Sequence, residues 1–180
     1  MDVDYQKQKA DLQLELPKLQ KLWDIKGPRL LKKAAELLNT SYGYRLDETG
    51  LFLCSNIPSW AKPRIISVWQ YMPSTPEKLR WKELEFVDVI FHEHLHMLVN
   101  RQLGWKLKSK ILDKYASEAL FAKIHIHLYA LQKQTYLELG LDSEWQQIVA
   151  RSKTFTPSYQ RAVEIVEQEG AEALVQEMKI

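Results

Sequence analysis

The sequence has few of the residues that mark a disulfide-rich, membrane-spanning or nucleic-acid-binding protein. Its 180 residues contain a single cysteine, Cys54, so no disulfide bond can form within the chain. No segment approaches the roughly 18 consecutive apolar residues of a membrane helix. The first residues have neither the basic nor the apolar part of a signal peptide. The net charge of +2 gives no electrostatic reason to expect nucleic acid as a partner. We therefore expect a cytoplasmic protein with no membrane span.

The composition is that of an ordinary globular domain, with 46% hydrophobic and 27% charged residues. The pattern of apolar residues predicts one α+β domain over residues 1–180, mostly helical, with a small antiparallel or mixed sheet before the central helices. The expected parts are N-terminal helices over 5–38, a β region over 42–71, helices over 76–139, and C-terminal helices over 143–178. Breaks are expected at Pro17 and at Gly27-Pro28, and a continuous helix is expected from about 109 to 139.

The most informative motif is His92-Glu93-x-x-His96, inside an apolar run that predicts a buried helix. On a helix, residues four apart differ by roughly 40° around the axis, so both histidines can bind one metal ion. Glu93 lies roughly 100° from His92, which suits a residue that holds a water molecule beside the metal. This is the arrangement of zinc hydrolases, in which the carboxylate takes a proton from the water. The alternative is that His92 and His96 are hydrogen-bonded core histidines.

A catalytic zinc site needs a third protein ligand. Glu118 is the best candidate, because a returning antiparallel helix would bring its carboxylate toward the two histidines. His125 follows seven residues later and returns to nearly the same helix face. It could donate a hydrogen bond to an oxyanion, orient Glu118, or replace Glu118 as the ligand. His94 and His127 are expected to face away from the metal.

These residues make the chain resemble a gluzincin, a zinc metallopeptidase whose third ligand is a glutamate on a following helix. The resemblance covers roughly residues 42 to 138. A metzincin is excluded, because Gln102 stands where that family has histidine. The resemblance implies that His92, His96 and Glu118 bind Zn²⁺, with Glu93 as general base and His125 assisting catalysis. It also implies a peptide or protein substrate, which would pair with the strand expected over 64–71. Ala122 departs from several gluzincin groups, which have aspartate there.

Two other interpretations remain open. Peptide deformylases also contain His-Glu-x-x-His, with an upstream cysteine ligand, and Cys54 could take that place. In that case Cys54→Ser would abolish zinc binding. Alternatively, the site could hold a structural metal in a non-catalytic binding module, and Glu93→Gln would then remove no turnover. The sequence makes no prediction of the oligomeric state or of the substrate's identity.

Overall fold

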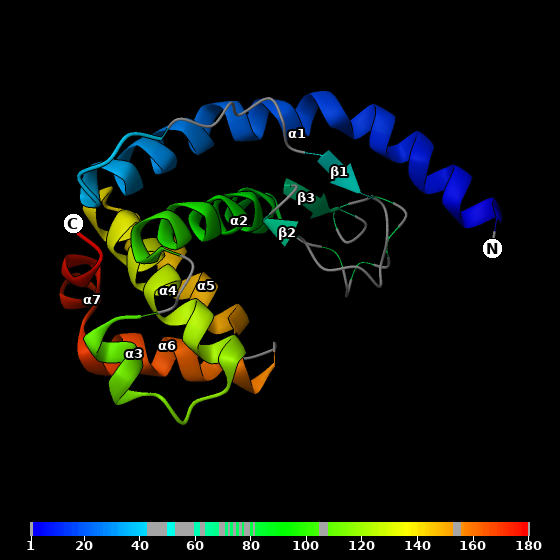
Figure 1. Ribbon diagram of the computed structural model, residues 1–180. Coiled ribbons are helices and arrows are strands. Elements are labelled where there is room, and N and C mark those ends of the chain that lie inside the picture. Colours follow the sequence, from blue (N-terminus) through cyan, green and yellow to red (C-terminus); the bar gives the residue numbers. More distant parts are fainter. Residues whose placement is uncertain are drawn as a thin grey trace. The chain divides into compact units, whose positions relative to one another are not determined.

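A computed structural model describes 148 of the 180 residues, and its elements are labelled in Figure 1. The described residues are 2–42, 50–52, 60–61, 64–68, 71, 73, 75, 77, 80, 82–104, 108–152 and 156–179. They belong to two compact units, Met1–Arg29 with Gly43–His94, and Leu30–Tyr42 with Leu95–Ile180. The boundaries after Arg29 and after His94 fall inside continuous helices. The helices are α1 (Asp2–Leu37), α2 (Glu83–Leu103), α3 (Lys110–Lys114), α4 (Leu120–Glu138), α5 (Asp142–Ser152), α6 (Pro157–Glu169) and α7 (Ala171–Glu177).

The predicted α+β class is wrong, because the protein belongs to the all-helical class. Helices α1, α2 and α4 alone contain 36, 21 and 19 residues. The described strands, β1 (Gly50–Phe52), β2 (Trp60–Ala61) and β3 (Arg64–Ser67), have three, two and four residues. Strands of this length cannot form a layer that carries half of a hydrophobic core.

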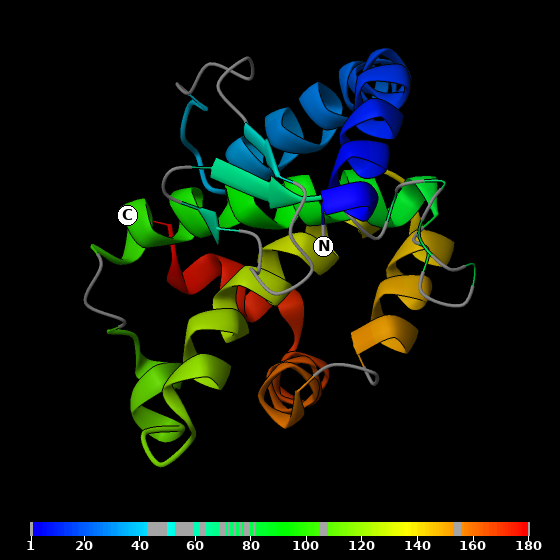
Figure 2. The same ribbon diagram turned by 90° about the vertical axis from the view of Figure 1, so that its right-hand side faces the viewer.

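The short strands also differ from the sheet that the sequence predicts, with a β-hairpin over 42–54 and an edge strand over 64–71. Strand β3 lies between its neighbours, parallel to β1 and antiparallel to β2 (Figure 2). Gly50 pairs with Ile65, which also pairs with Trp60. Because β3 is bonded on both sides, it is not the free edge that peptide pairing requires. The first strand and the turn of the expected hairpin fall in 43–49, outside the described residues.

Helix α1 continues through both prolines that were expected to break it. Each proline removes one backbone hydrogen bond and is costly inside a helix. Buried side chains follow Pro17 and flank Pro28, with Leu19 and Trp23 between the prolines and Leu30 after Pro28. Packing of these apolar side chains outweighs the local cost of the prolines, since burying each one is worth about 1.5–3 kcal/mol.

Helix α2 begins later than the Thr75-Pro76 pair predicts. Its first residue is Glu83, and the backbone N–H of Lys82 donates a hydrogen bond to the Glu85 carboxylate. This is half of a capping box, and both acidic residues favour the positive end of the helix dipole. The apolar side chains that follow are buried, including Phe86, Ile90, Phe91, Leu95 and Leu98. The motif histidines therefore lie on a helix anchored by its packed faces.

The helix expected over 109–139 is interrupted. Helix α3 ends at Lys114, and α4 begins only at Leu120. The intervening residues form turns, with the Glu118 N–H bonded to the Tyr115 carbonyl at 3.0 Å. Ala119, the residue before α4, has extended backbone angles, φ −54° and ψ 141°. Glu118 and His125 therefore do not share a helix, and the expectation that they share a face is wrong.

Helix α4 is the centre of the second unit, where it packs against α5, α6 and α7 (Figure 1). It is buried along most of its length, which includes polar positions such as Gln132 and Thr135. Glu177 on α7 joins this core to α3. One of its carboxylate oxygens lies 3.0 Å from His127 Nε2, and the other accepts the Ile111 N–H at 3.1 Å. These contacts tie α4 to α3 and α7 within this unit.

Candidate metal centre

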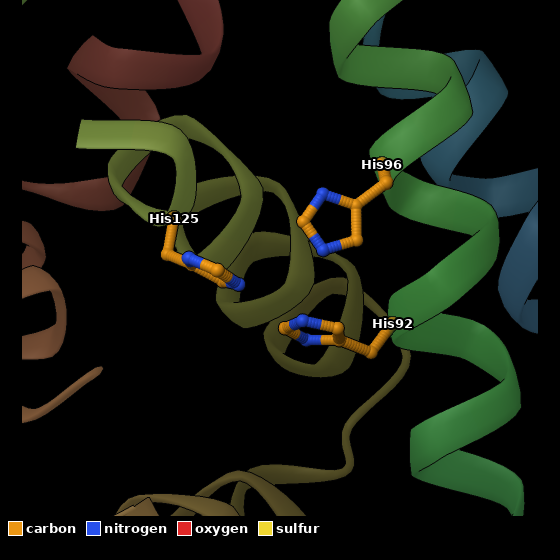
Figure 3. A group of neighbouring side chains, drawn as sticks. All are labelled: His92, His96 and His125. Carbon is orange, nitrogen blue, oxygen red and sulfur yellow. The ribbon is translucent and has the colours of Figure 1, made fainter. Parts of the chain in front are cut away.

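Three histidines converge in the structure, two from α2 and one from α4 (Figure 3). His92 and His96 are one turn apart on α2, and His125 lies on the second turn of α4. One ring nitrogen from each histidine lies within 4.8 Å of the other two. Within the described part of the chain, this is the one group of three or more metal-binding side chains that comes this close together.

The pair formed by His96 and His125 belongs entirely to the second unit. Their ring centroids are 5.0 Å apart, and the planes cross at 84°. His92 lies four residues before His96 on the same helix, α2. It therefore projects from nearly the same face and joins this pair. The local helix geometry therefore presents three imidazoles to one point.

The orientation of His125 is set by its own helix. Its Nδ1 lies 2.7 Å from the carbonyl oxygen of Phe121, one turn earlier. Since a carbonyl can only accept a hydrogen bond, Nδ1 carries the proton and Nε2 keeps its lone pair. Metal-binding histidines characteristically donate their second N–H to a carbonyl or carboxylate in this way, which fixes the ring and makes the free nitrogen more basic.

Burial keeps the described histidine pair neutral at physiological pH. Burial, together with the neighbouring His125, lowers the pKa of His96 to about 3. Burial also lowers the pKa of His125 to about 4, although the Phe121 carbonyl acts in the opposite direction. Neutral imidazole is the form that binds a metal ion, so these two ligands need not lose a proton first.

Three aromatic rings pack around His125. The centroids of Tyr159, Phe121 and Tyr129 lie 4.5, 5.0 and 5.8 Å from the His125 ring centroid. His125 is 2% exposed as a result. These rings give the imidazole an apolar environment of low local dielectric, which strengthens electrostatic effects at the site.

Glu93, the expected general base, is a buried carboxyl. Its side chain is 8% exposed, and no residue in the described ranges forms a hydrogen bond or an ion pair with it. Burial raises its pKa to about 7. A carboxyl group that is costly to ionise and has no ion-pair partner among the described residues is more typical of a functional site than of a structural ion pair.

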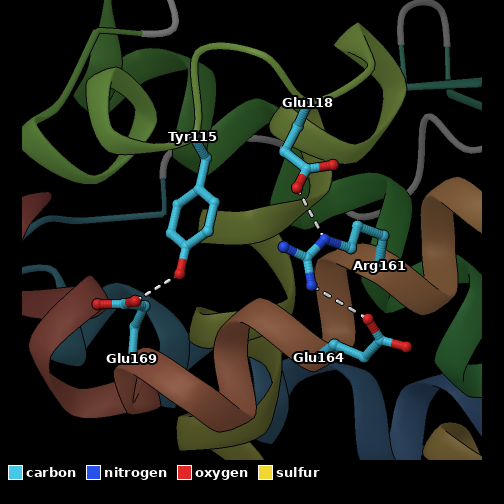
Figure 4. Close-up of polar contacts among 5 residues, drawn as sticks. All are labelled: Tyr115, Glu118, Arg161, Glu164 and Glu169. Atoms are coloured by element: carbon cyan, nitrogen blue, oxygen red, sulfur yellow. Dashed lines mark hydrogen bonds and ion pairs between the residues drawn. The ribbon is translucent and has the colours of Figure 1, made fainter.

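Glu118, the expected third ligand, is held elsewhere (Figure 4). One of its carboxylate oxygens accepts a hydrogen bond from Arg161 Nε at 2.8 Å. Arg161 on α6 also contacts Glu164 at 3.2 Å. Because the chain turns between α3 and α4, Glu118 is outside the group formed by the three histidines. The structure thus brings together the two motif histidines and His125, the alternative ligand.

The other two histidines have different surroundings. His94 is fully buried in the first unit, where its ring stacks on Trp23 with centroids 5.4 Å apart and an 11° angle between planes. His127 bonds to Glu177. Neither joins the group, as their positions on the helices predict. Cys54, the ligand of the deformylase interpretation, lies outside the described residues.

Comparisons with known proteins add no relative. The chain matches no protein-family model, no curated protein and no solved structure. Across the residues that the structure describes, every helix is too short or too polar to cross a membrane. The function must therefore be argued from the site itself.

The donor set fits a zinc ion. Zinc takes imidazole nitrogens at about 2.0–2.1 Å in tetrahedral geometry, which places ligand nitrogens about 3.3 Å apart. The three ring nitrogens lie within 4.8 Å of one another, so pairs at the wide end of this range would have to approach by about 1.5 Å to hold the ion. Three histidines leave the fourth position open, which is the composition of catalytic rather than structural zinc sites.

Proposed function

We propose that this protein is a zinc-dependent hydrolase, with His92, His96 and His125 as the metal ligands. The convergence of the three ring nitrogens to within 4.8 Å carries the proposal. The hydrogen bond from His125 to the Phe121 carbonyl supports it, because it leaves Nε2 as the unprotonated ring nitrogen. The site then has the His-Glu-x-x-His motif of a gluzincin but a histidine in place of the third ligand glutamate.

Each group would have a separate role in the reaction. A zinc ion bound by the three histidines would supply Lewis acidity, polarising a substrate carbonyl and lowering the pKa of water. Glu93 would accept the proton of the attacking water and then pass it to the leaving amine. An amide bond of a peptide is the substrate class that the resemblance to metallopeptidases favours.

Zinc content tests the ligand set. Protein purified without chelator should contain about one zinc per chain, which fits one closed ligand set. His125→Gln, which has similar volume, should lose most of it. Glu118→Ala should keep its zinc, because Glu118 pairs with Arg161. His127→Gln is the matched control, two residues away on the same helix but bonded to Glu177. Zinc retained in His125→Gln and lost in Glu118→Ala would overturn the three-histidine assignment.

Turnover of Glu93→Gln separates a hydrolase from a non-catalytic metal site. Removal of a general base typically costs about 10²–10⁴-fold in rate. The variant should therefore keep its zinc and lose at least about a hundredfold in peptide hydrolysis. A zinc-loaded wild type with no turnover against a broad peptide library would instead favour the structural-metal alternative.

A further inference from the structure

Exposed apolar side chains of the second unit gather beside the candidate metal centre. The large hydrophobic residues that remain exposed among those described are Leu14, Leu16 and Ile25 on α1, and Leu120 and Phe121 on α4. In the unit that holds His96 and His125, therefore, both exposed positions are at the start of α4. Leu120 is 62% exposed and Phe121 is 49% exposed.

The Phe121 ring is exposed but not loose. Its centroid lies 5.0 Å from the His125 ring and 5.3 Å from the Tyr159 ring, which it meets edge-on at 85°. Phe121 is one turn before His125, so both side chains project from nearly the same face of α4. An aromatic ring that is held by two neighbours and still half-exposed offers a preorganised apolar surface next to a metal ligand.

We infer that Phe121, with Tyr159 behind it and Leu120 extending the surface, forms a subsite for a large apolar side chain of the substrate. This inference rests on the proposed function. A substrate group bound at the metal would place its neighbouring side chain within reach of a surface one helical turn away. Leucine-sized or aromatic side chains would cover Phe121 and gain hydrophobic contact, whereas glycine would gain nothing there.

Amino-acid hydroxamates provide the probe, because the hydroxamate group binds zinc directly and the side chain can be varied. Leucine hydroxamate and glycine hydroxamate should be titrated calorimetrically into zinc-loaded protein. Leucine hydroxamate should bind wild type at least about tenfold more tightly, the usual effect of filling an apolar subsite. Phe121→Ala should bring this ratio close to one, and Leu120→Ala should lower it partially. Zinc content should not change in either variant, because His125 bonds to the main-chain carbonyl of Phe121.

Ile25→Ala is the matched control, since Ile25 is 64% exposed on α1 and lies in the other unit. It should leave the ratio unchanged. Equal binding of the two hydroxamates to zinc-loaded wild type would overturn the subsite while leaving the metal site in place. A preference for leucine hydroxamate that survives Phe121→Ala would also overturn it. Failure to load zinc at all would instead overturn the proposed function.

Discussion

At the scale of single residues, the five histidines show that surroundings rather than residue type decide the role. His92, His96 and His125 present nitrogens to one another. His94 uses its ring face to stack on Trp23, and His127 uses a nitrogen to bond a carboxylate. The spacing within α2 was enough to separate His94 from its neighbours in the sequence. The ligand role that we propose for His125, however, depends on where another helix places it.

Glutamate at position 93 should make the protein less stable than glutamine would at the same position. Its folded-state pKa, about 7, is above the value of 4.5 for the unfolded chain. Stability is therefore lost as the pH rises from 4.5 through 7, because the folded state resists ionisation. In metal-free protein, Glu93→Gln should raise the free energy of unfolding at pH 8 by about 1–3 kcal/mol, and by much less at pH 5. Urea unfolding at the two pH values measures this difference.

Glu138→Gln is the control for this prediction, because Glu138 is an exposed glutamate at the end of α4. It should change the unfolding free energy little at either pH. A Glu93→Gln variant that is equally or less stable than wild type at pH 8 would show that the Glu93 carboxylate is not strained by burial.

At the scale of elements, the interruption between α3 and α4 explains why Glu118 is not in the group of three histidines. Residues 115–119 contain neither proline nor glycine, so no local signal breaks the helical pattern there. Tertiary contacts hold the turn, including Tyr115 to Glu169 and Glu118 to Arg161 (Figure 4). Their partners are about 40–55 residues away in the chain, beyond the range of sequence periodicity.

Gly27 should be an exception to the rule that alanine stabilises helix interiors. Alanine is ordinarily about 1 kcal/mol better than glycine there. A Cβ at Gly27, however, would lie 2.5 Å from atoms of the Trp23 ring, which is 4% exposed and cannot move aside freely. Such overpacking costs about 1–3 kcal/mol. We therefore expect Gly27→Ala to lower the free energy of unfolding, as measured by denaturant titration.

A double-mutant cycle provides the control for Gly27. In a Trp23→Ala background the clash is absent, so Gly27→Ala should become stabilising by about 0.5–1 kcal/mol. If Gly27→Ala stabilised the wild-type background by the same amount, the close packing of Gly27 against Trp23 would be disproved.

At the scale of the whole molecule, the buried histidines should make the metal-free protein sensitive to acid. Burial lowers the pKa values of His96, His125 and His127, the first two to about 3 and 4. A histidine of lowered pKa contributes stability that is complete above the unfolded value of 6.5 and is lost as the pH falls below it. The raised pKa of Glu93 has the opposite effect on stability over pH 4.5–7, but it is a single group, whereas three histidines lose stability in acid.

The free energy of unfolding should therefore fall by about 2–4 kcal/mol between pH 7 and pH 5, a large part of a typical domain's stability. Chemical unfolding of metal-free protein across this range provides the measurement. Saturating zinc should add stability at pH 7, because an ion that binds only the folded state shifts the equilibrium toward it. A metal-free protein whose stability is flat or rises toward pH 5 would contradict the neutral, buried state of these histidines.

The sequence by itself determined the local features of this protein. Fixed helical spacing places His92 and His96 on one face and His94 on another, and Pro157 starts α6 as its position after Thr156 predicts. Tertiary structure decided the rest. Helix α1 continues through two prolines, and the expected sheet consists of short strands. Glu118 pairs with Arg161, whereas His125 lies beside the two motif histidines. The physical reason is the distance along the chain. Periodicity in the sequence describes residues within a few helical turns of one another, whereas the third candidate ligand comes from a helix that meets α2 only in the folded chain.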